Sequence, residues 1–202
     1  MISRVFGTGK SFKKLCSYLA TGEDGLQLER DRVLWVECFN LPTRNWEVAA
    51  CMMAATASTS VSNAQEPVYH FTVSCHPDDP VDAETLRRIA RRTIRDMGLR
   101  DHQVVVFAHK NRSHLHLHFV VNRVHPERGT LWSMWRDCYR MERSLRAQER
   151  ELGLLIVPGW LAPTLRSKGW AEASRGRDRK EWQAGSGLAP DPVEGTTASC
   201  AK

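Results

Sequence analysis

Hydrophobic and polar positions follow two different periods along the chain, and the period predicts whether a segment is a helix or a strand. Residues 11–20 carry apolar side chains at helical spacing, with Ser11 in the N-cap position. The predicted helices cover 11–20, 43–58, 80–98 and 134–152, and the predicted strands cover 32–39, 67–74, 104–108 and 114–118. The order begins with a helix and places two strands in succession before the last helix. This order favours an α+β fold, with helices packed on an antiparallel or mixed sheet, over a doubly wound parallel sheet.

Length and composition are typical of one domain with a tail. The chain has 202 residues, enough to bury a core but short for two domains. We expect a domain over 1–160 and a basic, weakly ordered tail over 161–202, where periodicity fades and Gly, Pro, Ser and Thr accumulate. The six cysteines are scattered without a CxxC pair, which indicates reduced thiols. No apolar stretch has the length of a signal core or a membrane span, so we expect a cytoplasmic protein without membrane insertion.

The chain is basic, which favours a polyanionic partner. Its formal net charge is +6, and the excess is mostly arginine, whose planar donors suit phosphate. Arginines gather on two predicted helices, as Arg87, Arg88, Arg91, Arg92 and Arg95 on one and Arg136, Arg140, Arg143, Arg146 and Arg150 on the other. Either set could contact phosphates or form a solvated face with local ion pairs, and the pattern does not decide which helix would face DNA.

Histidines provide the most informative pattern in the chain. The segment His114–His118 alternates histidine and leucine, so its three imidazoles share one face of a strand. The preceding apolar run ends at His109, and residues 110–113 have the length of a hairpin loop, so the two strands should pair antiparallel. If His109 lies opposite His114, it joins the same face and lies diagonal to His116. The sequence then predicts a metal site on a β-hairpin that carries four histidines.

Imidazole ligands alone do not name the ion, because several divalent metals accept neutral histidine. Three protein ligands leave coordination positions open, as a Lewis-acid catalyst requires. A metal beside a basic surface suggests nuclease or phosphotransfer chemistry, with metal-bound water or a side chain as nucleophile. Of the three tyrosines, Tyr69 and Tyr139 are expected to serve packing, whereas Tyr18 lies at the edge of an apolar helical stripe.

Three ordered segments resemble the motifs of conjugative relaxases. The segment 109–126, HKNRSHLHLHFVVNRVHP, resembles the third motif of the P-type relaxase and mobilization nuclease family, within the histidine-hydrophobe-histidine endonuclease superfamily. Residues 11–19 resemble the first motif with its nucleophilic tyrosine, and residues 69–74 resemble the second. The resemblance covers residues 7–160.

The resemblance implies a role for each matching residue. Tyr18 becomes the nucleophile, and the metal triad becomes His109, His116 and His118. Ser74 would help to hold DNA near the nick. His114 would support the site from the loop, and Asn122 would orient it.

The implied reaction is transesterification on single-stranded DNA at a transfer origin, with Mg²⁺ or Mn²⁺ polarising the phosphate and a 5′-phosphotyrosine as product. An accessory DNA-binding relaxosome protein and a coupling ATPase are the implied partners. Many relatives place an acid two residues after the first histidine, where this chain has Asn111. Two alternatives therefore stay open: a relaxosome DNA-binding component that nicks poorly, and a metal-dependent hydrolase that uses bound water.

Overall fold

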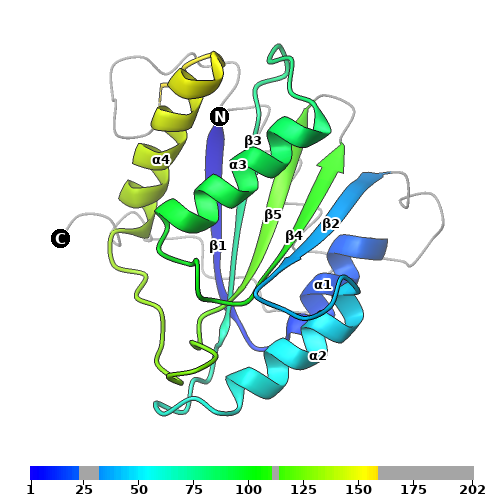
Figure 1. Ribbon diagram of the computed structural model, residues 1–202, viewed down its shortest axis with the longest axis vertical. Helices are drawn as coiled ribbons and strands as arrows, with labels where there is room; N and C mark the ends of the chain where they lie inside the picture. The colour runs from blue at the N-terminus through cyan, green and yellow to red at the C-terminus, as the bar shows by residue number, and fades with distance from the viewer. Residues whose placement is uncertain (23–31, 111–113, 159–202) are drawn as a thin grey trace, which may run out of the picture.

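The computed structural model describes residues 1–22, 32–110 and 114–158, and within them four helices accompany a five-stranded sheet (Figure 1). The strands are β1 (Ile2–Gly9), β2 (Val33–Phe39), β3 (Val68–Ser74), β4 (Val104–Lys110) and β5 (Leu115–Asn122). The helices are α1 (Phe12–Thr21), α2 (Trp46–Ala57), α3 (Ala83–Asp96) and α4 (Asp137–Leu152). The expected 161–202 tail, the domain end at 160 and Asn111 all lie outside the described residues.

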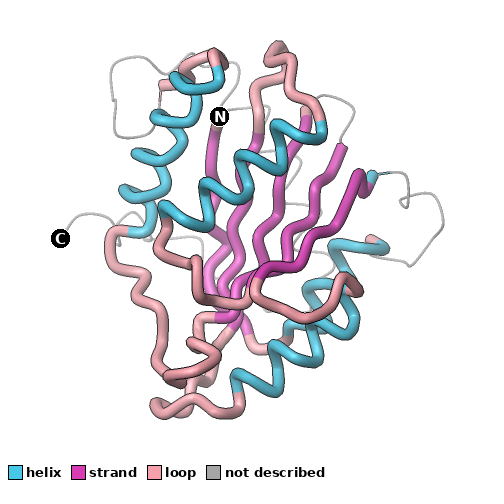
Figure 2. The backbone as a smooth tube through the Cα atoms, viewed as in Figure 1, coloured by secondary structure: helices cyan, strands magenta, loops and turns pink. Residues whose placement is uncertain are grey.

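The sheet order is β1-β3-β5-β4-β2, and every neighbouring pair is antiparallel. The predicted α+β class is therefore confirmed, with a wholly antiparallel sheet. The hairpin strands β4 and β5 lie inside the sheet, flanked by β2 and β3 (Figure 2). This placement holds side chains on the hairpin in a rigid frame, because both strands pair on both sides along nearly their whole length.

β1 is the described strand that the hydrophobic pattern did not predict, so the expected order beginning with a helix was wrong. β1 lies at the edge of the sheet and pairs with β3. Its residues are all partly buried, and its register shifts between Val5 and Gly7, where Gly7 adopts a φ of 101° that favours glycine. A bulged edge strand gains its order from backbone pairing, so it lacks the regular alternation of a strand with one buried face.

The two faces of the sheet bury separate apolar clusters, each covered by two helices. Helices α3 and α4 pack together on one face, against Tyr69, Phe71, Leu117, Phe119 and their neighbours. Helices α1 and α2 pack on the opposite face, against Val105, Phe107, Val120 and their neighbours (Figure 1). Because side chains alternate along each strand, this division also decides which polar residues can meet.

Side-chain caps set where the helices begin. Ser11 Oγ accepts a hydrogen bond from the Lys14 backbone N–H at 3.2 Å, as its N-cap position predicts. Asn45 caps α2, so this helix begins three residues later than expected. None of the described helices is both long and apolar enough to cross a membrane.

Candidate metal centre and tyrosine site

The β4–β5 hairpin pairs in a register two residues away from the expected one. His109 lies opposite His116, and Phe107 lies opposite His118, whereas the sequence prediction placed His109 opposite His114. A shift of two residues leaves every side chain on its original face. His109 therefore still joins the imidazole face, now as the direct cross-strand partner of His116.

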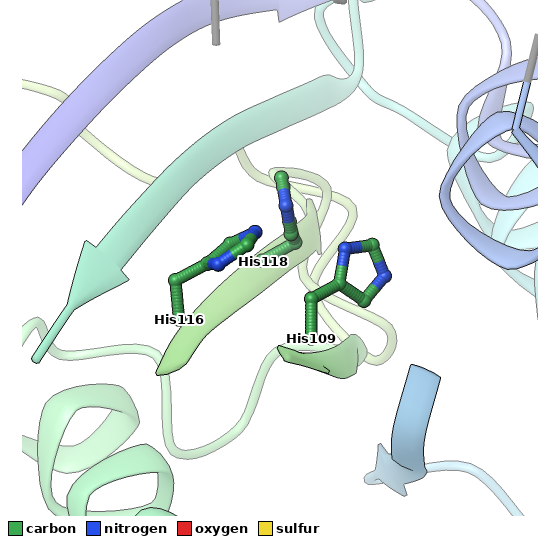
Figure 3. A group of neighbouring side chains, drawn as sticks. All are labelled: His109, His116 and His118. Carbon is green, nitrogen blue, oxygen red and sulfur yellow. The ribbon is translucent and has the colours of Figure 1, made fainter. Parts of the chain in front are cut away.

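Three of the four histidines on or beside the hairpin, the three that the resemblance implied as a triad, form a group among the described residues that could hold a metal ion. His109, His116 and His118 each offer a ring nitrogen, and these nitrogens lie within 4.8 Å of one another. The ring centroids are 5.3 Å apart for His109 and His116, 4.6 Å for His109 and His118, and 4.8 Å for His116 and His118. Figure 3 shows His116 and His118 rising from one strand and His109 from its neighbour, on the same side of the sheet. His114 precedes β5, and its ring is 5.4 Å from that of His116.

The three imidazoles are held in the neutral form. Burial lowers the pKa of His109 to about 3, and the positive charge of Arg32 acts in the same direction. Burial also lowers the pKa values of His116 and His118 well below 6.5, with neighbouring histidines adding to the effect. A neutral imidazole keeps a lone pair, which is the form that binds a metal.

The donor set fits a divalent metal. His109 Nε2 and His116 Nδ1 are buried and have no hydrogen-bond partner among the described residues. Such a buried polar atom is costly unless something outside the chain satisfies it. Three neutral histidines that share one face supply three nitrogen ligands and leave further coordination positions open.

Helix α1 places Tyr18 beside this group. His109 forms a hydrogen bond with the backbone of Leu19, the residue that follows Tyr18. Arg32 donates to the Tyr18 carbonyl oxygen at 2.9 Å, and its guanidinium carbon lies 5.9 Å from the centre of the Tyr18 ring. Tyr18 itself is partly buried at the margin of the apolar cluster under α1 and α2. The histidines, the tyrosine helix and a positive charge therefore converge on one face of the sheet.

Ser74 lies next to the same group. It ends β3 and is the direct cross-strand partner of His116, so the two side chains share a face at a Cβ separation of about 5 Å. Ser74 is partly buried. This position is compatible with the predicted DNA contact near the nick.

Asn122, in contrast, lies at the other end of β5, about 20 Å along the strand from His116. Its side chain is fully buried and donates to the Met53 carbonyl oxygen and to Gln103 Oε1, each at 3.0 Å. Its Oδ1 accepts the Val124 backbone N–H at 3.0 Å. The structure thus places Asn122 where it joins α2, the residue before β4 and the turn after β5, away from the histidine group.

The other two tyrosines lie on the opposite side of the sheet from the histidines. Tyr69 is buried as expected, and its hydroxyl donates to Asp137 Oδ2 at 2.7 Å. Burial and the Asp137 carboxylate raise the pKa of Tyr69, which makes it a poor nucleophile. Tyr139 on α4 is 48% exposed, so the expectation that it serves packing was wrong. Neither ring shares a face with the histidines.

The arginine-rich helices α3 and α4 also cover the face opposite the histidines. Many of their arginines are paired within the protein. Arg91 Nη2 donates to Glu37 Oε1 at 3.0 Å, and Arg92 Nε donates to Asp96 Oδ2 at 2.7 Å. The local ion-pair alternative therefore accounts for much of the arginine pattern on α3.

Sequence reasoning missed two residues at the site, His70 and Arg32. His70 Nε2 lies 3.1 Å from His118 Nδ1, and burial lowers the pKa of His70 to about 3. The available signal was the alternation of His70, Thr72 and Ser74 along β3, which places all three on the histidine face. Arg32 precedes β2 and carried no local signal, because only the tertiary fold brings it to Tyr18.

An antiparallel sheet thus presents three histidines that could hold a metal ion, next to the helix that carries Tyr18. Residues 19–154 match the family described as relaxase, MobA/VirD2-like, nuclease domain, and the chain belongs to this relaxase family. The matched region begins one residue after Tyr18, so the role of Tyr18 is not carried by the match.

Three curated proteins are similar in sequence to part of this chain. The chain is 35% identical over 146 residues to Protein TraI of Escherichia coli, covering 71% of this chain and 19% of that protein. A second Escherichia coli Protein TraI is 28% identical over 147 residues, covering 72% and 19%. Protein MobA of Acidithiobacillus ferrooxidans is 27% identical over 70 residues, covering 35% and 17%. The chain thus spans about a fifth of the length of the curated relatives it matches.

A solved structure supports the fold. It comes from work on the molecular basis of vancomycin resistance transfer in Staphylococcus aureus and has a TM-score of 0.50 at 10% identity. The match covers 76% of this chain and 95% of that chain. At this identity the likeness shows a common fold.

Proposed function

We propose that this domain nicks single-stranded DNA at a transfer origin in conjugative mobilization, with Tyr18 as the nucleophile. The observation that carries the proposal is that α1 packs on the sheet face that carries the three histidines, with Arg32 donating to the Tyr18 carbonyl oxygen at 2.9 Å. A relaxase needs the histidine group and the tyrosine on the same phosphate, because the phosphorus attacked by the tyrosine is the one whose charge must be stabilised.

The metal in this proposal is Mg²⁺ or Mn²⁺, held by His109, His116 and His118. When bound, it supplies Lewis-acid polarisation of the scissile phosphate. The protein's own contribution is the orientation of the three imidazoles by two paired strands, and their neutral state at physiological pH. Ser74, opposite His116, contributes a hydroxyl that can hydrogen-bond to the DNA backbone next to the nick.

In the chemical step, Tyr18 Oη attacks phosphorus and the bond from phosphorus to the 3′ oxygen breaks. The phenolic proton leaves Tyr18, and the departing 3′ oxygen gains a proton as a 3′-hydroxyl. A phenol has a pKa near 10, so attack at neutral pH requires removal of the phenolic proton. The guanidinium of Arg32, which lies over the Tyr18 ring, can pair with the charged phosphate. The resulting 5′-phosphotyrosine retains an ester bond that the 3′-hydroxyl can attack to rejoin the strand.

The proposal extends to partners and location. Base-specific recognition of the origin would use unpaired bases, and backbone contacts would make binding dependent on salt. An accessory DNA-binding relaxosome protein and a coupling ATPase are the expected partners, in the cytoplasm. The relatives named TraI are about five times longer than the matched segment, so these further roles are proposed for the domain in the context of a transfer apparatus.

The test is incubation of the full chain with labelled single-stranded DNA from the transfer origin of its own genetic element, followed by denaturing electrophoresis. We expect a protein–DNA adduct with Mn²⁺ that disappears with EDTA and in Tyr18→Phe. Tyr139→Phe is the matched control, because Tyr139 is exposed on the opposite side of the sheet and should leave the adduct unchanged.

Two other outcomes would contradict the proposal. Metal-dependent cleavage that persists in Tyr18→Phe without an adduct would indicate a hydrolase that uses bound water. Binding without cleavage, across several origin fragments and both metals, would indicate a DNA-binding relaxosome component that nicks poorly.

A further inference from the structure

We propose that His70 is a positioning residue, which accepts a hydrogen bond from His118 Nδ1 and so directs His118 Nε2 toward the metal. This inference rests on the proposed metal site and assigns a residue outside the triad to its support. His70 lies on β3, whereas the triad lies on β4 and β5.

The contact between the two rings has hydrogen-bond geometry. His70 Nε2 and His118 Nδ1 are 3.1 Å apart, and both side chains are buried. A neutral imidazole carries one ring proton, so a proton on Nδ1 leaves a lone pair on Nε2. With a metal at His118 Nε2, the ring proton must lie on Nδ1, where His70 Nε2 is placed to accept it. Metal-binding histidines commonly make such a bond through their second nitrogen.

The surroundings of His70 hold its ring in place. The Phe6 ring stacks on it with centroids 4.5 Å apart and planes inclined by 14°. On β1, the guanidinium carbon of Arg4 lies 4.8 Å from the centre of the Phe6 ring. The second His70 nitrogen, Nδ1, is buried and has no partner among the described residues. Among the described residues, His118 is therefore the hydrogen-bond partner of the His70 side chain.

This arrangement also gives β1 a role at the site. The bulge of β1 between Val5 and Gly7 lies at the position paired with His70, and it delivers Phe6 onto the His70 ring. His70 thus supports a member of the triad from a third strand, β3.

Two substitutions separate the hydrogen bond from the packing. His70→Phe keeps an aromatic ring that can stack on Phe6 but removes the acceptor. His70→Gln loses the stack but places a carbonyl oxygen within reach of His118 Nδ1. Mn²⁺ affinity is measured by titration calorimetry on the full chain without DNA, and thermal unfolding in EDTA establishes that each variant is folded.

We expect His70→Phe to weaken Mn²⁺ binding by about 10- to 100-fold, the usual effect of losing a supporting partner of a metal-bound histidine. We expect His70→Gln to recover most of that loss, even where its thermal midpoint in EDTA is lower. Nicking by His70→Phe should return toward the wild-type rate at high Mn²⁺, because the defect is in metal affinity.

Other patterns would overturn the inference. Wild-type affinity in His70→Phe would show that the ring serves packing alone. Equal losses in both variants would show that an acceptor at this position is insufficient. His118→Ala distinguishes failure of the proposed function: if it binds Mn²⁺ as tightly as the wild type, the triad itself is not the metal site and His70 has nothing to position.

Discussion

Acidification of the metal-free protein tests whether the histidine group is buried as the structure places it. Burial lowers the folded-state pKa values of the four histidines on this face of the sheet, namely His70, His109, His116 and His118. It also lowers the pKa of His102, which lies beside Asn122. In the unfolded chain these groups titrate near 6.5, so below that pH the unfolded state binds more protons than the folded state. Stability is therefore complete above pH 6.5 and is lost as the pH falls toward the folded values.

The magnitude follows from the two residues with a defined folded pKa. For His70 and His109 that value is about 3, so neither protonates in the folded state between pH 7.5 and 5.5. Over this interval each contributes about a tenfold change in the unfolding equilibrium. Together they change the equilibrium about 100-fold, or about 3 kcal/mol, and His102, His116 and His118 act in the same direction. Burial raises the pKa of Glu142, which offsets part of this loss.

The assay is urea unfolding at a series of pH values with EDTA present. The curves are fitted with one common slope of the free energy of unfolding against urea concentration. A loss of about 3 kcal/mol is a large part of the 5–15 kcal/mol typical of a domain. His70→Phe removes one titrating group, so the change in its unfolding equilibrium over the same interval should be about tenfold smaller than in the wild type. A free energy of unfolding that stays constant between pH 7.5 and 5.5 would refute the buried, neutral histidine group.

Two substitutions test the placement of residues away from the site. Asn122→Ala removes three buried side-chain hydrogen bonds and should lower the free energy of unfolding by about 3 kcal/mol. Nicking, measured at low temperature where the variant stays folded, should be unchanged. A variant that loses nicking but keeps the wild-type stability would show that Asn122 acts at the site. Arg91→Ala breaks an ion pair with Glu37 on the face opposite the histidines. Its affinity for single-stranded DNA, and the salt dependence of that affinity, should therefore stay within about twofold of the wild-type values. Arg32→Met, beside Tyr18, should weaken DNA binding. A large loss in Arg91→Ala would instead make α3 a DNA-binding surface.

Patterns within single elements were readable because their physical cause is local. The alternation of histidine and leucine in His114–His118 placed these imidazoles on one face whatever the fold, and His109 joined them because an even shift of register preserves the face. The helical stripe of α1 and its Ser11 cap were equally local. β1 escaped notice because a bulged edge strand without a buried face has no period to detect.

Pairing between distant segments decided the rest. The sequence alone determined the class of fold, the strand that carries His116 and His118, and the tyrosine at the margin of a helical stripe, since each depends on residues a few positions apart. Only the tertiary structure decided that His109 lies opposite His116, that His70 from β3 contacts His118, and that Arg32 reaches Tyr18. Only it placed the α3 and α4 arginines on the face away from the histidines. These relations depend on register and on which sheet face each helix covers, and both are set by the packing of the whole domain.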